Sequence, residues 1–165
     1  MSYRIGLGYD VHQLVEGETL WIGGILIPHD KGLVAHSDGD VLLHAICDAL
    51  LGAAKLRDIG YHFPDSSAEF RSIDSKLLLA ETYRMVSDKG FRLVNLDATI
   101  SAQRPRLKEY IPGMEAAISK VLNTDIEAIN IKATTTEKLG FEGREEGISV
   151  QAVVLIENAD MVKLG

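Results

Sequence analysis

The stretch that decides the fold is Tyr3-Arg4-Ile5-Gly6-Leu7-Gly8-Tyr9-Asp10-Val11-His12, near the start of the chain. Residues 3–9 have the apolar character of a β-strand, and Asp10 and His12 follow it two positions apart. Side chains at positions i and i+2 of a strand point to the same face, so these two can aim at one point. Carboxylate and imidazole groups suit a divalent ion such as Zn²⁺. The alternative is that both are ordinary polar residues where a strand meets a loop.

A third candidate ligand is His44, in a helix expected to open at Asp38-Gly39-Asp40 and to run to about residue 54. Asp38 is the expected cap of this helix. Asp40 and Asp48 lie four residues before and after His44 on the same helical face, so either could accept the second ring N–H of a metal-bound histidine. Three protein ligands would leave one position of a tetrahedral zinc ion open for substrate. Alternatively, His44 is a surface histidine flanked by carboxylates.

The remaining pattern predicts an α+β fold in one domain, residues 1–165, with a small mixed β-sheet and helices packed on one face. Its last strand is apolar on both faces and therefore needs cover on both, so we expect another subunit to cover the face opposite the helices. The other expected elements are a hairpin of residues 20–22 and 25–27 around Gly23-Gly24, helices at 74–89 and 112–122, strands at 93–102, 129–133 and 147–157, and polar loops at 56–72 and 134–147.

Composition narrows the class of function. A net charge of −7 argues against a general nucleic-acid or anionic-membrane surface. No run of about 18 apolar residues predicts a membrane span. The single cysteine, Cys47, cannot form an intrachain disulfide, which fits a reducing cytoplasm. A strand pattern that starts almost at Met1 leaves no room for a signal peptide.

Two further segments have the chemistry of phosphate binding. His36 and Ser37 lie beside the expected helix start, where free N–H groups attract anions, although simple capping explains the same residues. The run from Lys132 to Lys138 places consecutive threonines at a strand end, with Glu137 as a possible ligand of a hard cation; the alternative is a threonine-rich turn. Arg144 could bind an anion or pair with neighbouring glutamates.

Taken together, these segments closely resemble the 2-C-methyl-D-erythritol 2,4-cyclodiphosphate synthase family of the non-mevalonate isoprenoid pathway, over essentially the whole chain. The matching blocks are Gly8-Tyr9-Asp10-Val11-His12, Ala35-His36-Ser37-Asp38-Gly39-Asp40-Val41, Asp58-Ile59-Gly60, Phe63-Pro64-Asp65 and Lys132-Ala133-Thr134-Thr135-Thr136-Glu137-Lys138-Leu139-Gly140-Phe141. The resemblance implies a phosphorus–oxygen lyase that cyclises 4-diphosphocytidyl-2-C-methyl-D-erythritol 2-phosphate and releases CMP.

The resemblance also implies roles for single residues. Asp10, His12 and His44 correspond to ligands of one Zn²⁺ per subunit, and Glu137 to a ligand of Mg²⁺ or Mn²⁺ at the diphosphate. His36 and Thr135 correspond to residues that stabilise the transition state. The implied substrate-binding positions are Ser37, Asp58, Ile59, Gly60, Phe63, Pro64, Asp65, Ser66, Ser67, Ala102, Gln103, Arg104, Pro105, Arg106, Leu107, Lys108, Ala133, Thr134, Thr136, Phe141 and Arg144. The family often has Lys-Met-Leu where this chain has Arg106-Leu107-Lys108, which leaves the roles of side chains 107 and 108 open.

Members of this family are homotrimers with active sites between subunits, which suits a sheet whose second face is turned to a trimer interior. Phe141 and Arg144 correspond to residues near a central channel that binds isoprenoid diphosphates in relatives. The resemblance implies a bacterial cytoplasmic enzyme without nucleic-acid or membrane partners. Two other readings of the residues remain open: a zinc-dependent phosphohydrolase of nucleotide diphosphates, and a non-catalytic trimer that binds small diphosphates.

Overall fold

A computed structural model describes residues 3–64, 66–67 and 72–159 of the 165-residue chain. Its elements, in chain order, are β1 (Tyr3–Glu16), β2 (Trp21–Ile22), β3 (Ile25–Leu26), β4 (Lys31–Val34), α1 (Val41–Ala53), α2 (Ile59–His62), α3 (Ser75–Asp88), β5 (Phe91–Ser101), α4 (Ile111–Leu122), the 3₁₀ helix η2 (Ile126–Ala128), β6 (Ile129–Thr134), α5 (Gly140–Gly143) and β7 (Gly147–Asn158). Within these described ranges, none of the helices is long and apolar enough to cross a membrane.

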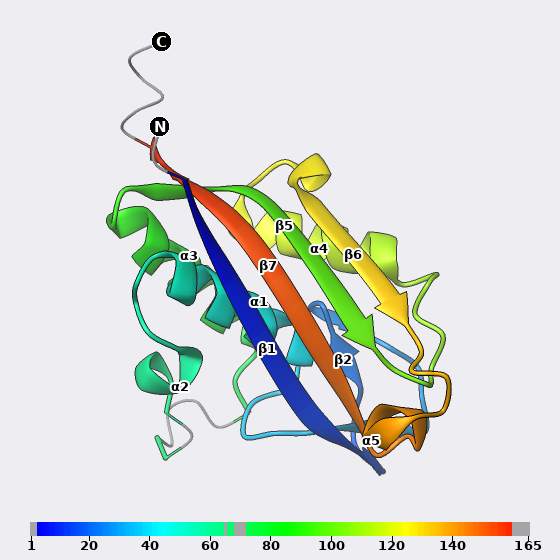
Figure 1. Ribbon diagram of the computed structural model, residues 1–165. Helices are drawn as coiled ribbons and strands as arrows, with labels where there is room; N and C mark the ends of the chain where they lie inside the picture. Colours follow the sequence, from blue (N-terminus) through cyan, green and yellow to red (C-terminus); the bar gives the residue numbers. More distant parts are fainter. Residues whose placement is uncertain (1–2, 65, 68–71, 160–165) are drawn as a thin grey trace.

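The main sheet has five strands in the order β4-β1-β7-β5-β6. β7 runs antiparallel to both β1 and β5, whereas β5 and β6 are parallel. Helices α1, α3 and α4 lie behind one face of the sheet, and the other face is open (Figure 1). The prediction of a mixed sheet with helices on one face is therefore confirmed.

The side chains of β1 alternate between the two faces of the sheet. Gly6, Gly8, Asp10, His12 and Leu14 lie on the side of the helices, where they are buried or half-buried. The two glycines let the backbone of α1 approach the strand closely: a Cβ on Gly8 would lie 1.8 Å from the Ala45 carbonyl oxygen. This close approach is what brings a helical side chain within reach of Asp10 and His12.

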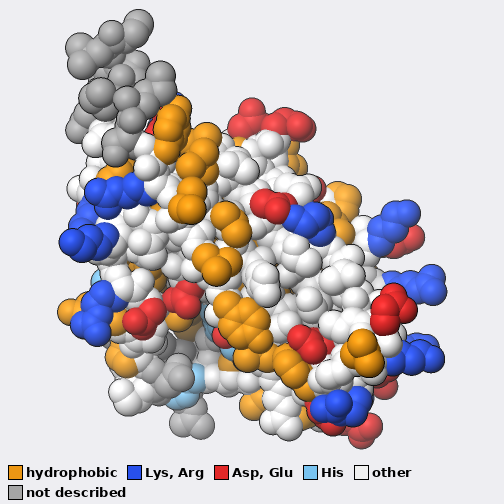
Figure 2. Space-filling model, viewed as in Figure 1, with side chains coloured by type: hydrophobic (Ala, Val, Ile, Leu, Met, Phe, Trp, Pro, Cys, Tyr) orange, Lys and Arg blue, Asp and Glu red, His pale blue; other side chains and the backbone are white. Residues whose placement is uncertain are grey.

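The outward side chains of β1 form an exposed apolar strip on the open face of the sheet. Ile5 is 75 % exposed and Leu7 67 %, and Val153 on the neighbouring β7 is 45 % exposed. Figure 2 shows hydrophobic side chains following β1 down this face. The inward residues of β7 from Ile148 to Ile156 are buried, and Val153 lies on the outer face. Apolar residues are therefore present on both faces of this strand, as predicted.

The bounds and caps of some elements differ from the sequence prediction, because contacts with distant segments determine them. β1 continues to Glu16, well past residue 9, because its far end pairs with β4, a short strand that has no clear sequence pattern. The expected loop at 56–72 contains the single-turn helix α2. Helix α1 begins at Val41 with Asp40 as its cap; the prediction that Asp38 caps it is wrong, because Asp38 binds the start of α3.

Candidate metal centre

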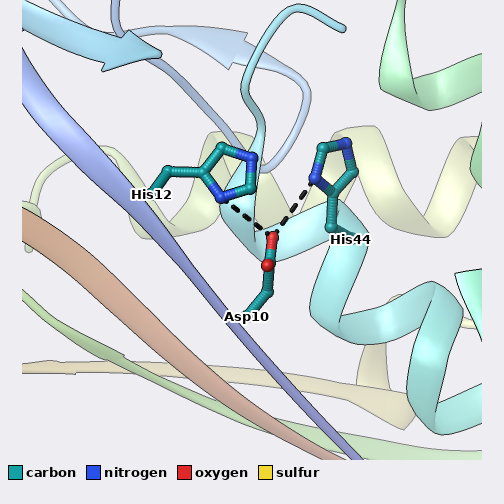
Figure 3. A group of neighbouring side chains, drawn as sticks. All are labelled: Asp10, His12 and His44. Atoms are coloured by element: carbon teal, nitrogen blue, oxygen red, sulfur yellow. Dashed lines mark hydrogen bonds and ion pairs between the residues drawn. The ribbon is translucent and has the colours of Figure 1, made fainter. Parts of the chain in front are cut away.

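Three side chains converge between β1 and α1. Asp10 and His12 come from the helix-facing side of β1, and His44 comes from the first turn of α1 (Figure 3). Each offers one ligand atom, and these atoms lie within 4.8 Å of one another. Asp10 Oδ2 is 3.2 Å from the Nδ1 atoms of both histidines. The predicted convergence of the three residues is therefore confirmed as geometry.

The chemistry of these donors fits a divalent metal. His12 Nδ1 is buried, and within the described residues no hydrogen bond satisfies it, although Asp10 Oδ2 approaches it to 3.2 Å. An unsatisfied buried nitrogen beside a carboxylate is a position that a cation would stabilise. One carboxylate and two imidazoles form a three-ligand set with an open fourth position, which is the arrangement of catalytic zinc sites.

The two histidines have opposite protonation tendencies. Burial lowers the pKa of His12, and the neighbouring His44 adds to this effect, so the His12 ring is neutral and available as a ligand at neutral pH. Burial also acts to lower the pKa of His44, but the Asp10 carboxylate outweighs it and holds that pKa above its ordinary value. Metal binding at His44 would therefore compete with protonation of that ring.

A cavity of about 360 Å³ opens beside this cluster. Its wall includes His36 and Ser37 from the loop before α1, and Ile59, Gly60 and Phe63 from α2 and its end. The structure thus gathers these predicted site residues around the metal ligands. Gln13, Val34, Ala35, Ile73 and Leu78 also line the cavity, and sequence reasoning missed them because they carry no distinctive chemistry. None of the described lining residues is lysine or arginine.

The hydrogen bonds of His44 correct one prediction. Its Nε2 lies 3.0 Å from Ser75 Oγ and 3.1 Å from Ser37 Oγ, so neither Asp40 nor Asp48 is its partner. The Asp48 carboxylate instead accepts a bond from the Ile59 backbone N–H at 2.7 Å. The expectation rested on helical spacing, but the ring turns away from the helix surface toward α3. No sequence signal links Ser75 to a histidine 31 positions earlier.

Asp40 has a structural task of its own. Its fully buried carboxylate accepts bonds from the backbone N–H groups of Gly23, Gly24 and Leu43. Burial raises the pKa of Asp40, and these three donors oppose that rise by stabilising the charged form. The side chain thereby ties the β2–β3 hairpin to the start of α1.

A second group of predicted residues lines a separate cavity of about 280 Å³, which shares no lining residue with the first. Its wall is formed by Ala102, Gln103, Pro105, Arg106, Leu107, Lys108, Ile111, Ala133, Thr134 and Thr135. Arg104 does not line this cavity, and its Nε lies 3.8 Å from Glu145 Oε1. Among the described residues, the predicted cationic side chains that line a cavity are Arg106 and Lys108. Both line the second cavity.

The loop after β6 places Glu137 close to this second cavity. Glu137 is exposed and has a positive φ of 53°, followed by Lys138 at 65°. The Thr135 hydroxyl lies 3.4 Å from the Glu137 carboxylate, and the Lys138 N–H donates to Gln103 Oε1 at 3.2 Å. These bonds hold the loop in a conformation that non-glycine residues rarely adopt. Thr136 donates instead to the backbone oxygen of Leu139.

The remaining predicted positions that the structure describes do not line either cavity. Asp58 caps α2, and the backbone N–H of Ser67 donates to the Pro64 oxygen. Ser66 is exposed. Arg144 forms two 3.0 Å bonds to Glu146, and Phe141 packs near Gly147. Asp65 falls outside the described residues.

Comparisons with known proteins find relatives in both sequence and fold. The model of the YgbB family matches residues 3–157. A 2-C-methyl-D-erythritol 2,4-cyclodiphosphate synthase of Bacteroides fragilis is 61 % identical over 94 % of this chain and 98 % of its own length. The bifunctional IspDF of Campylobacter jejuni has a TM-score of 0.92 and 44 % identity, covering 95 % of this chain and 42 % of that one. The IspF of Plasmodium falciparum, solved as a CDP complex, has a TM-score of 0.83 and 34 % identity, covering 95 % of this chain and 97 % of that one.

Proposed function

The chain belongs to the YgbB family, and on that premise we propose that it is a phosphorus–oxygen lyase of the non-mevalonate isoprenoid pathway. It converts 4-diphosphocytidyl-2-C-methyl-D-erythritol 2-phosphate to 2-C-methyl-D-erythritol 2,4-cyclodiphosphate and releases CMP. The observation that carries the proposal is the cluster of Asp10, His12 and His44 at the cavity lined by His36 and Ser37.

This reaction depends more on the alignment of the two phosphate groups than on a strong general base. A phosphate nucleophile is already ionised at neutral pH, so the chain has to hold the 2-phosphate in line with the β-phosphorus and offset the repulsion between two anions. Zn²⁺ held by the three ligands would act as a Lewis acid and a template. His36 and Ser37 line the same cavity and can donate hydrogen bonds to phosphate oxygens there.

The distribution of charge supports active sites between subunits. The first cavity has no lysine or arginine among its described lining residues, although its substrate carries two anionic arms. Arg106 and Lys108 line the second cavity, next to Thr135. We propose that the second cavity of one subunit faces the first cavity of its neighbour. Thr135 would then act at the same diphosphate, and Glu137 would hold a Mg²⁺ or Mn²⁺ ion there.

A homotrimer would supply this arrangement and also bury the apolar strip of β1. Ile5, Leu7 and Val153 are exposed in the isolated chain, and a strip of this kind is typical of a subunit interface. Phe141 and Arg144 would then lie near the axis, where Arg144 could bind an isoprenoid diphosphate. A ligand there has to compete with Glu146, which already pairs with Arg144.

Phosphorus NMR of the purified protein with substrate, Zn²⁺ and Mg²⁺ tests the function. We expect two coupled resonances of a cyclic diphosphate together with free CMP. His44→Ala should abolish tight zinc binding and lower turnover by orders of magnitude, whereas His29→Ala, on a loop that lines neither cavity, should leave both unchanged. Solvent ¹⁸O in the product would identify a phosphohydrolase instead, and binding without CMP release would identify a non-catalytic diphosphate carrier.

A further inference from the structure

We propose that Ser75 and Asp38 are positioning residues that determine which ring nitrogen of His44 faces the metal. The inference rests on the proposed zinc centre and adds two residues to it, one from α3 and one from the loop before α1. Ser75 is fully buried, and its Oγ is 3.0 Å from His44 Nε2. The same Oγ donates to Asp38 Oδ1 at 2.5 Å.

The direction of these bonds follows from counting protons. The Asp38 carboxylate is an acceptor, and it also takes the backbone N–H of Ser75 at 2.9 Å and that of Asp40 at 3.2 Å. Ser75 has one hydroxyl proton, which Asp38 receives, so Ser75 Oγ can only accept from His44. Nε2 of His44 must therefore carry a proton. Nδ1 lies 3.2 Å from Asp10 Oδ2 and is left as the nitrogen that would give up its proton to a metal.

This arrangement also leaves Ser37 free to act on a ligand. Ser37 Oγ lies 3.1 Å from the same Nε2 and accepts the backbone N–H of Gly39 at 3.3 Å. An Nε2 that donates its proton to Ser75 has no lone pair left to accept a proton from Ser37. The hydroxyl proton of Ser37 is consequently not needed by His44 and can be donated into the cavity that Ser37 lines.

A purely structural role for the pair has to be separated from this one. The Asp38–Ser75 bonds also pin the first residue of α3 to the loop before α1, so their loss could simply loosen the fold. The two roles differ in what they do to the ring. A structural clamp changes the free energy of unfolding, whereas a positioning bond also changes the zinc affinity and the exchange of the Nε2 proton.

The test compares Ser75→Ala with Ser87→Ala, a matched substitution in the same helix, where the Ser87 hydroxyl donates to the Tyr83 carbonyl at 2.9 Å. Zinc affinity is measured in the substrate-free protein by competition with a chelator. The His44 ring is followed by ¹⁵N NMR of the zinc-loaded protein. We expect Ser75→Ala to weaken zinc binding about 10- to 100-fold and to speed exchange of the Nε2 proton with water, and Ser87→Ala to change neither.

Asp38→Asn is the second variant, and it keeps both the side-chain volume and the Ser75 hydroxyl. Its amide NH₂ must face either the Ser75 hydroxyl or the Ser75 backbone N–H, both of which are donors, so it should weaken zinc binding in the same direction. Zinc coordinated through Nε2 of His44, or folded Ser75→Ala and Asp38→Asn proteins with wild-type zinc affinity, would overturn the positioning role alone. A wild-type protein that binds no zinc would remove the metal centre itself.

Discussion

Replacing Gly8 with alanine should damage the metal centre without touching a ligand. The added Cβ would lie 1.8 Å from the Ala45 carbonyl oxygen of α1, whereas an ordinary contact begins at 3.4 Å, so the helix has to move away by about 1.6 Å. Ala45 follows His44 directly, so the same movement carries His44 away from Asp10 and His12. Ligand distances tolerate only about 0.2 Å.

Overpacking of this kind costs about 3 kcal/mol at the upper end of the usual range. The atoms that the Cβ would meet belong to the backbone of Ala45 and Ala49, which cannot rotate away as a side chain could. A displacement of about 1 Å at a reacting centre costs about 100-fold in rate. We therefore expect Gly8→Ala to lower the free energy of unfolding by about 3 kcal/mol and to reduce turnover by about 100-fold. Urea unfolding at equal protein concentration and chelator competition measure the stability and the zinc affinity.

Gly52→Ala is the control, since it makes the same chemical change within α1. A Cβ at Gly52 meets no atom within 4 Å, so alanine should stabilise the helix, by up to about 1 kcal/mol. We thus expect Gly8→Ala to lower the free energy of unfolding and Gly52→Ala to raise it. A Gly8→Ala protein that loses less than about 1 kcal/mol and keeps wild-type zinc affinity would refute the idea that close helix–strand approach sets the ligand geometry.

Three further predictions concern other parts of the chain. Thr135→Ala should lower turnover and leave zinc content unchanged, as measured by metal analysis; loss of zinc would point to a structural role. Burial raises the pKa of Cys47 to about 12, so the thiol should stay unreactive toward a disulfide reagent at pH 8 until urea unfolds the protein, and rapid labelling of the native state would contradict this. Leu7→Glu should dissociate the proposed trimer in light scattering, whereas Leu77→Glu, at a similarly exposed leucine on α3, should not; a Leu7→Glu trimer would place the interface elsewhere.

Several features of the molecule follow from short-range pattern alone. Asp10 and His12 share a face because a strand has a period of two, and that holds wherever the strand packs. Helix α3 ends at Asp88, two residues before Gly90, and the hairpin forms around Gly23-Gly24, as their glycines predict. The apolar character of both faces of β7 is likewise visible in the sequence.

What only the tertiary structure decided is how distant segments meet. The partner of His44 is Ser75 and not a carboxylate four residues away, because the ring turns toward α3 and the local helix face does not hold it. The carboxylate of Asp40 accepts hydrogen bonds from the β2–β3 hairpin and is not a hydrogen-bond partner of the His44 ring. The division of the site residues between two cavities depends on where loops from β5 and β6 pack. Residue spacing fixes directions within one element, but distances between elements are set by packing of side chains and backbone that are far apart in the chain.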